Sequence, residues 1–216
     1  MQVKDNLKSI LSKIPNGVTL VAVSKTKPSE AIKEAYDFGH RDFGENYVQE
    51  LVAKSEKLPN DIRWHFIGHL QSNKVKYIAP FVYMIHGVDS LKLLKEINKQ
   101  AEKFNRTINC LLQLHIAKEE TKFGLSYKEA DHVLNSPELS TFKNIQIKGF
   151  MGMATNTEDE SIIRKEFTEF TTYANNYPNL PIKSIGMSSD YLLAIECGGN
   201  MIRIGSSIFG NRNYTI

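Results

Sequence analysis

Short apolar segments alternate with helical patterns along the whole chain, and this alternation is the strongest constraint on its fold. Most of these segments are nearly continuous in apolar residues, as expected for strands buried on both faces. Strand followed by helix, repeated, predicts a parallel sheet covered by helices. We expect strands over residues 18–24, 41–45, 64–68, 83–89, 108–116, 145–153, 183–187 and 200–205.

Helical spacing of apolar residues fills the intervals between these segments. One helix follows Pro28 and ends at Gly39, and a second is opened by Asn46. A short helix is expected after residue 68, up to about residue 79, and further helices over 91–104, 127–135 and 163–174. The segment "SSDYLLAIECG" separates the last two strands. Eight strand–helix units predict an α/β fold, a (β/α)8 barrel of the TIM type, with an open doubly wound sheet as the alternative. No linker composition interrupts the pattern, so we expect one domain over residues 1–216.

Charge and composition exclude several classes of protein. The 216 residues carry 27 basic and 24 acidic side chains, for a net charge of +3, and no basic tract that would favour nucleic acid or an anionic membrane. No apolar run reaches membrane-spanning length, and "MQVKDNLKSIL" lacks the apolar core of a signal peptide. The 2 cysteines, Cys110 and Cys197, form no CxxC pattern, which predicts no disulfide, no metal site and a cytoplasmic protein. No helix has a surplus apolar face, so we expect a monomer.

The first predicted strand ends in a lysine, in "VTLVAVSKTKPSEAI". Side chains alternate along a strand, so Lys25 shares a face with Val21 and Val23 and would project into the barrel mouth, where barrels carry their chemistry. A partly desolvated lysine loses proton affinity, and its neutral amine attacks carbonyl groups. The alternative is a lysine that has simply reached solvent at the strand end.

The two last strand ends carry glycine and serine. "SIGMSSDYLL" places Gly186 and Ser188 before a helix, and "MIRIGSSIFGN" places Gly205 and Ser206 after the final strand. The corresponding loops of barrels commonly bind phosphate, because glycine allows close approach and backbone N–H groups and hydroxyls donate hydrogen bonds. The alternatives are an ordinary helix N-cap among Ser188, Ser189 and Asp190, and turn geometry at Gly205.

Arg203, in "NMIRIGSS", would point to the same face as Gly205. A guanidinium stays charged and needs a partner when buried. That partner is either a carboxylate inside the barrel or an aromatic nitrogen acceptor. A lysine, a phosphate cradle and an inward arginine together describe a site for pyridoxal 5′-phosphate (PLP), held as a Schiff base. An arginine leaves the pyridine nitrogen unprotonated, which weakens the ring as an electron sink.

The motifs "VAVSKTKP", "FGENYVQE", "WHFIGHLQSNK", "GFMGMAT", "GMSSDYLLAI" and "IRIGSSIFG" resemble those of the pyridoxal phosphate homeostasis protein family. The resemblance implies a barrel like the N-terminal domain of alanine racemase, the type III fold of PLP proteins. It implies PLP on Lys25, phosphate contacts from Ser188, Gly205 and Ser206, and Arg203 at the pyridine nitrogen. Asn46 matches an asparagine near the cofactor, although it could equally be a helix N-cap paired with Gln49.

The resemblance also implies a function in vitamin B6 homeostasis: the chain binds PLP and delivers it to apo PLP-dependent enzymes, without substrate turnover. The alternatives are a PLP-dependent amino-acid racemase with Lys25 as its base, and a Schiff-base aldolase without PLP. Alanine racemase needs a second base, a tyrosine from another domain, and here only Tyr214 near the terminus could be considered.

His65 is expected to face the barrel as a core histidine bonded to backbone, Trp64 to pack under a helix, and His115 receives no role.

Overall fold

A computed structural model describes residues 2–119 and 123–210 of the chain. Its parallel strands close into a barrel in the order of the sequence, because β1 pairs with both β2 and β8. The (β/α)8 prediction is confirmed, and the open doubly wound alternative is wrong. The strands are β1 (Thr19–Val23), β2 (Asp42–Glu45), β3 (Arg63–Phe66), β4 (Met84–Val88), β5 (Ile108–Leu114), β6 (Ile145–Gly152), β7 (Ile182–Ser184) and β8 (Met201–Ile204).

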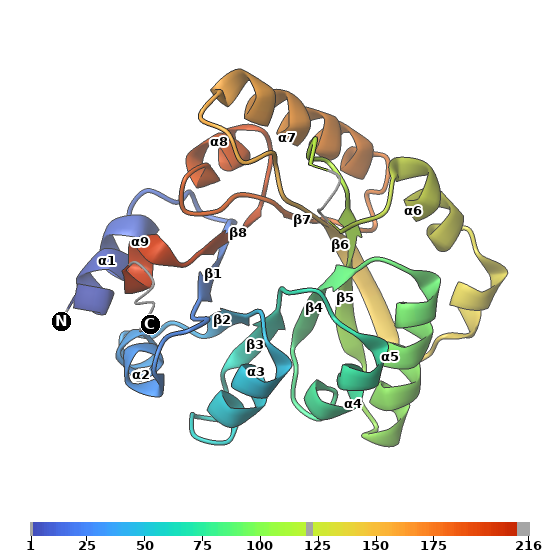
Figure 1. Cartoon of the computed structure of the whole chain (residues 1–216), viewed down its shortest axis with the longest axis horizontal. Coiled ribbons are helices and arrows are strands. Elements are labelled where there is room, and N and C mark those ends of the chain that lie inside the picture. Colours follow the sequence, from blue (N-terminus) through green and yellow to red (C-terminus); the bar gives the residue numbers. More distant parts are fainter. Residues whose placement is uncertain (1, 120–122, 211–216) are drawn as a thin grey trace.

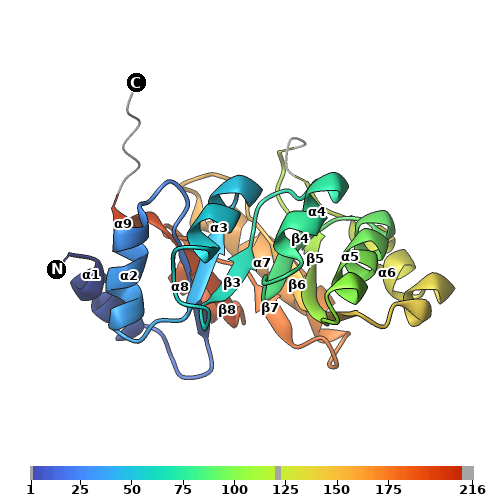
Figure 2. The same cartoon turned by 90° about the horizontal axis from the view of Figure 1, so that it is seen from below.

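Helices surround this barrel on the outside (Figure 1 and, from the side, Figure 2). They follow the predicted intervals, with short 3₁₀ segments before α4 and after α6. The helices are α1 (Gln2–Leu11), α2 (Ser29–Asp37), α3 (Val48–Ser55), α4 (Val75–Ile78), α5 (Leu91–Lys103), α6 (Tyr127–Leu134), α7 (Glu160–Asn175), α8 (Tyr191–Glu196) and α9 (Ser206–Phe209), and the 3₁₀ segments are η1 (Ser72–Lys74) and η2 (Pro137–Thr141).

Capping side chains determine where several helices begin. Ser90 accepts a hydrogen bond from the N–H of Leu93 at the start of α5. Ser126 and Glu129 form a reciprocal capping box at the start of α6. Such caps satisfy N–H groups that have no acceptor within the helix.

Helix α1 was not among the predicted elements, although Val3, Leu7, Ile10 and Leu11 recur in it at helical spacing. Leu7 and Ile10 are buried, and Asn6 Nδ2 donates to the carbonyl of Ile208 in α9 at 2.9 Å. The helix therefore joins the first and last parts of the chain on the outside of the barrel.

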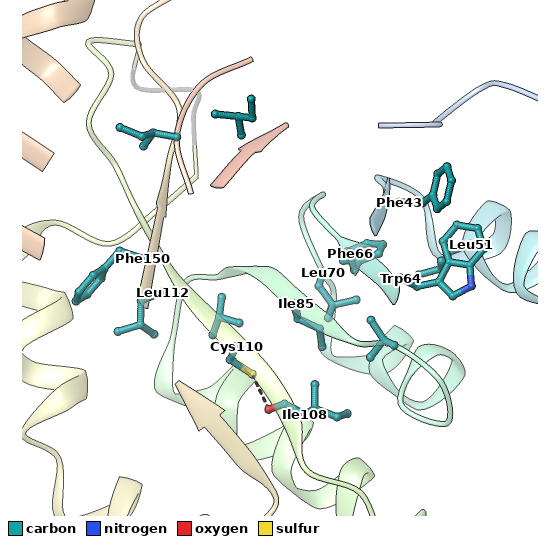
Figure 3. Packing of buried hydrophobic residues seen from close by; sticks show 14 of the residues in the cluster. Phe43, Leu51, Trp64, Phe66, Leu70, Ile85, Ile108, Cys110, Leu112 and Phe150 are labelled. Atoms are coloured by element: carbon teal, nitrogen blue, oxygen red, sulfur yellow. Dashed lines mark hydrogen bonds between the residues drawn. The ribbon is translucent and has the colours of Figure 1, made fainter. Parts of the chain in front are cut away.

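The main apolar core lies between the strands and the helices. Figure 3 shows Phe43, Leu51 and Trp64 together on this outer side. Trp64 is buried, with its ring centroid 6.1 Å from that of Phe43, and Leu51 of α3 lies beside it in Figure 3, in agreement with a position under a helix. Burial of this layer supplies the principal stabilisation of the barrel.

The inside of the barrel is divided between apolar and polar side chains. The apolar part is a cluster of Val21, Met84, Leu111, Met151 and Met201. The polar part is also buried and comprises His65, His86, Gln113, Ser184 and Arg203. Because polar groups are rarely buried without partners, this second set indicates a hydrogen-bonded network inside the barrel.

Both cysteines are free thiols, and burial raises the pKa of the Cys110 thiol. In residues 2–119 and 123–210, no helix has the combined length and apolarity needed to cross a bilayer.

Candidate functional site

The six residues predicted for a binding site line one cavity of about 340 Å³. They lie on or just after strands β1, β2 and β8, and in the segment that follows β7. The prediction had brought together Lys25, Asn46, Ser188, Arg203, Gly205 and Ser206, and the structure adds Lys27, Ser189 and the apolar side chains of Val23, Ile67, Met153 and Met187.

Pairing of the first strand with the last explains how distant parts of the sequence meet in this cavity. Val21 in β1 lies in register with Arg203 in β8. Lys25 and Gly205 follow these strands at the same end of the barrel. The amine of Lys25, the guanidinium of Arg203 and the loop at Gly205 therefore enter the cavity from two neighbouring strands, β1 and β8.

The loop that carries Lys25 has an uncommon backbone conformation. Thr26 has a φ of 64°, in the left-handed region that β-branched residues rarely adopt. Its N–H donates to Oε1 of Glu50 at 2.6 Å, and the N–H of Ser24 donates to the carbonyl of Gly44 at 2.9 Å. These bonds fix the backbone on both sides of Lys25.

Buried charges outside the barrel support the same loop. Lys54 Nζ contacts Glu45 Oε1 at 2.7 Å, Glu50 Oε1 at 2.6 Å and the carbonyl of Ser24 at 2.7 Å. The Ser24 hydroxyl also donates to Glu45 Oε1, at 2.6 Å. Burial raises the pKa of Glu45, and the charge of Lys54 acts in the opposite direction. One lysine of α3 thus links the ends of β1 and β2 to the loop that carries Lys25.

Ser188 and Gly205 are in contact where the loops after β7 and β8 line the cavity. The N–H of Gly205 donates to Ser188 Oγ at 3.2 Å. Helix α8 begins after Asp190, which occupies the N-cap position without a side-chain hydrogen bond to the helix. Of the three N-cap candidates, the position therefore belongs to Asp190 and not to Ser188 or Ser189. Gly205 has a φ of −117°, which other residues adopt, but a Cβ here would lie 3.1 Å from the carbonyl oxygen of Val23. Close approach to β1, rather than turn geometry, requires this glycine.

Asn46 has a buried oxygen without a partner. Helix α3 starts at Val48 with Tyr47 as its N-cap, so the proposed pairing of Asn46 with Gln49 is wrong. Among the described atoms, Asn46 Oδ1 is buried and accepts no hydrogen bond. A Cβ at Gly68 would overlap the carbonyl of Asn46, so glycine is what lets this backbone reach the cavity. An unsatisfied polar group lining a cavity indicates a polar ligand there.

Arg203 is 4% exposed and is held by oxygen atoms of the barrel. Its Nη1 donates to the carbonyl and the hydroxyl of Ser184, both at 2.7 Å, and its Nη2 donates to the carbonyl of Gly152 at 2.9 Å. These partners replace the hydrogen-bonded carboxylate that was the alternative prediction. Burial lowers the pKa of Arg203 to about 10, against the effect of the Asp190 charge, so the side chain stays charged at neutral pH.

The histidines depart from the predictions. His65 faces the barrel as expected, but its ring nitrogens lie 3.0 Å from Asp42 Oδ1 and 2.9 Å from His86 Nε2, so its partners are side chains and not backbone. His86 was missed, although strand alternation from Met84 would have placed it inside. His115 lies 3.0 Å from the carbonyl of Glu119 and does not line the cavity.

Two sequence interpretations concern other groups. Tyr214 lies outside the described residues. Within residues 2–119 and 123–210, no group of 3 or more His, Cys, Asp or Glu side chains is arranged to hold a metal ion. The site chemistry is that of amines, hydroxyls and a guanidinium, which suits a phosphorylated ligand with an acceptor nitrogen.

Comparison with known proteins gives one consistent family. The profile of the family described as "Alanine racemase, N-terminal domain" matches residues 1–213. The pyridoxal phosphate homeostasis protein of Vibrio alginolyticus is 39% identical over 93% of this chain and 89% of its own length. The protein of the same name from Schizosaccharomyces pombe is 38% identical over 96% of this chain and 91% of its own length.

Solved structures agree with this result. PipY of Synechococcus elongatus with PLP bound is 36% identical, with a TM-score of 0.88 over 97% of this chain and 100% of that chain. An alanine racemase from Clostridium difficile has a TM-score of 0.80 over 99% of this chain and 58% of that chain, at 13% identity. The second likeness concerns the fold alone.

The buried charges beneath Lys25 lead to a prediction about stability. Lys54→Met should lower the free energy of unfolding by roughly 3–5 kcal/mol, because Glu45 would keep a buried carboxylate without its cation. Since burial raises the pKa of Glu45, the folded variant takes up a proton more readily than the unfolded chain, and the loss should shrink as the pH falls. Urea unfolding at acidic and at neutral pH measures both effects.

Lys33→Met is the matched control, because Lys33 forms an exposed ion pair with Asp37 one helical turn away. It should leave the unfolding midpoint almost unchanged. An equally small effect for Lys54→Met would contradict a supporting role of the buried pair.

Proposed function

The chain belongs to the alanine racemase N-terminal domain family, among its pyridoxal phosphate homeostasis proteins, and on this premise we propose that it binds PLP and acts in its homeostasis and delivery. The observation that supports this most directly is the cavity at the β1–β8 seam, which gathers a lysine, a guanidinium, a serine–glycine loop and an unsatisfied amide oxygen. PLP supplies an aldehyde that condenses reversibly with a lysine amine.

Each polar group of this cavity has a counterpart on the cofactor. Lys25 provides the amine for the covalent linkage, as a Schiff base. Ser188, Ser206 and the N–H groups around Gly205 hold the phosphate, since hydroxyls and glycine loops suit phosphate oxygens. Arg203 donates to the pyridine nitrogen, and Asn46 offers its amide to the remaining polar edge of the ring.

Cofactor storage fits the cavity better than racemisation does. The described residues that line the cavity include lysines, serines, an asparagine and an arginine, but no tyrosine, histidine or carboxylate that could act as a second base opposite Lys25. The relatives are named for PLP homeostasis and not for an enzymatic activity. A Schiff-base aldolase without PLP is the weaker alternative, because such an enzyme has no use for a buried arginine directed at a ring nitrogen.

Delivery requires a recipient, and we propose that apo PLP-dependent enzymes take PLP from this site. A reversible linkage at an open strand end is suited to transfer to another amine. We further propose that the chain works as a single PLP-binding domain over residues 1–216, as a monomer in the cytoplasm.

Replacing the lysine tests the proposed attachment. Wild-type protein with PLP should show an absorbance band near ~420 nm that borohydride removes. Lys25→Ala should lose this band, whereas Lys27→Ala, a change in the same cavity, should keep it. Mass spectrometry after reduction should find the pyridoxyl mass on Lys25, and a label on Lys27 or Lys74 instead would refute the assignment. Circular dichroism controls for folding.

A second prediction concerns the phosphate. Ser206→Ala should weaken PLP binding by about one to two decades, since a hydrogen bond to a charged group contributes roughly 1.5–3 kcal/mol. Pyridoxal, which lacks the phosphate, should be affected much less. Ser207→Ala is the control, because Ser207 is the next residue along the chain and its side chain does not line the cavity. Equal losses for both ligands in a titration would show that Ser206 does not bind the phosphate.

The third prediction is that the PLP-loaded protein does not racemise amino acids efficiently. A missing general base costs roughly 10²–10⁴-fold in rate, and an unprotonated pyridine nitrogen weakens carbanion stabilisation further. Incubation with L-alanine in deuterated water, followed by optical activity and deuterium at Cα, measures turnover. Rates of about 1 per second or more would favour a racemase. Negligible exchange, with PLP transfer to an apo-enzyme, is the expected result.

A further inference from the structure

A line of hydrogen bonds crosses the inside of the barrel from the far end of the strands to the cavity. Asp42 Oδ1 lies 3.0 Å from His65 Nε2, and His65 Nδ1 lies 2.9 Å from His86 Nε2. His86 Nδ1 lies 3.1 Å from the hydroxyl of Ser184, which accepts from Arg203 Nη1 at 2.7 Å. Both histidines are fully buried, so each of these atoms depends on the next for its hydrogen bond.

The two ends of this line determine its direction. A guanidinium can only donate, and an ionised carboxylate can only accept. Burial opposes ionisation of Asp42, but hydrogen bonds from Arg63 and His65 outweigh it and hold the pKa of the carboxyl well below its usual range. The proton positions that satisfy every member therefore run from Arg203 to Ser184, His86, His65 and Asp42.

This order assigns one tautomer to each histidine. Ser184 donates its hydroxyl proton to His86 Nδ1, so the proton of His86 is on Nε2. That proton points to His65 Nδ1, so His65 also carries its proton on Nε2 and donates it to Asp42. Burial and the charge of Arg203 lower the pKa of His86 well below its usual value, which agrees with a neutral ring.

The line also determines which donors of Arg203 remain for a ligand. A guanidinium has five N–H groups, and bonds to Ser184 and Gly152 use both on Nη1 and one on Nη2. The other two, on Nη2 and Nε, belong to a side chain that lines the cavity. Without His86, the Ser184 hydroxyl could turn its proton elsewhere, and Arg203 would lose a fixed acceptor.

We propose that Asp42, His65, His86 and Ser184 are positioning residues for Arg203, which hold its guanidinium charged and oriented toward a ring-nitrogen acceptor in the cavity. The carboxylate of Asp42, which is itself paired with Arg63, sets the order of the protons, and the polarised hydrogen bonds carry this order to Arg203. This inference rests on the proposed PLP site for the identity of the acceptor, but the order of protons inside the barrel does not depend on any ligand.

Nitrogen NMR of the full-length protein, labelled with ¹⁵N in histidine and without added ligand, tests the proton order. Variants His65→Gln and His86→Leu assign the two ring signals. Both rings should be neutral at pH 7, with the proton on Nε2. A proton on Nδ1 of either ring, or a charged imidazolium, would overturn the proposed direction.

Ligand affinity tests the effect on Arg203. The probes are PLP and its carbocyclic analogue, in which C–H replaces the ring nitrogen. Ser184→Ala and His86→Leu should each weaken PLP binding about tenfold and leave the affinity for the analogue unchanged. Ser184→Thr keeps the hydroxyl, so it should bind PLP as the wild type does. His132→Gln, an exposed change on α6, is the control and should affect neither ligand.

The outcomes separate the two proposals. Equal losses for both ligands, or no loss for either, would refute the positioning role while PLP binding by the wild type stands. Failure of the wild type to bind PLP would refute the proposed function, and the NMR result would still decide the proton order. Should the variants not fold, nuclear Overhauser contacts between the two adjacent rings assign their signals in the wild type, and the tautomers measured there decide the proposal.

Discussion

The buried guanidinium of Arg203 is the constraint around which the inside of this barrel is organised. A charge removed from water must recover its hydration through hydrogen bonds, and β8 alone cannot supply them. The acceptors come from Gly152 in β6 and from Ser184 in β7. Ser184 in turn needs the histidines of β3 and β4, which end at Asp42 in β2. One charge thus explains why part of the barrel interior is polar while the rest remains apolar.

The Lys25 loop is supported from the other side of the same strands. Side chains alternate along β1 and β2, so inward positions serve the cavity while Ser24 and Glu45 point outward to Lys54. Glu50 then fixes the backbone of Thr26 in a conformation that a β-branched residue would not adopt alone. The lysine is therefore presented by a rigid loop, although the side chain itself extends into an open cavity.

The strand ranges and five of the cavity residues could be predicted from the residues themselves, because periodicity identifies elements and parallel strands bring their carboxyl ends together. The sixth, Asn46, was predicted only from the resemblance to a known family. Helix α1 was not predicted, although Val3, Leu7 and Ile10 recur at helical spacing and pack on the core. Pairings such as His65 with His86, or Lys54 with Glu45, depend on which strands and helices become neighbours in space. A pattern within one segment carries no information about them, and for the same reason Asn46 was interpreted as a cap when its oxygen is unsatisfied.

The seam between β1 and β8 links cofactor capture to the closure of the barrel. During synthesis, Lys25 emerges well before Arg203, Gly205 and Ser206, because about 180 residues separate them. A ribosome-bound chain that lacks β8 cannot assemble the cavity, so it cannot trap a reactive aldehyde before the barrel closes. Once closed, a ligand that bridges both strands favours the closed form by mass action, by about 2.7 kcal/mol at a hundredfold excess over its Kd. Ligand supply and closure of the barrel are therefore thermodynamically linked.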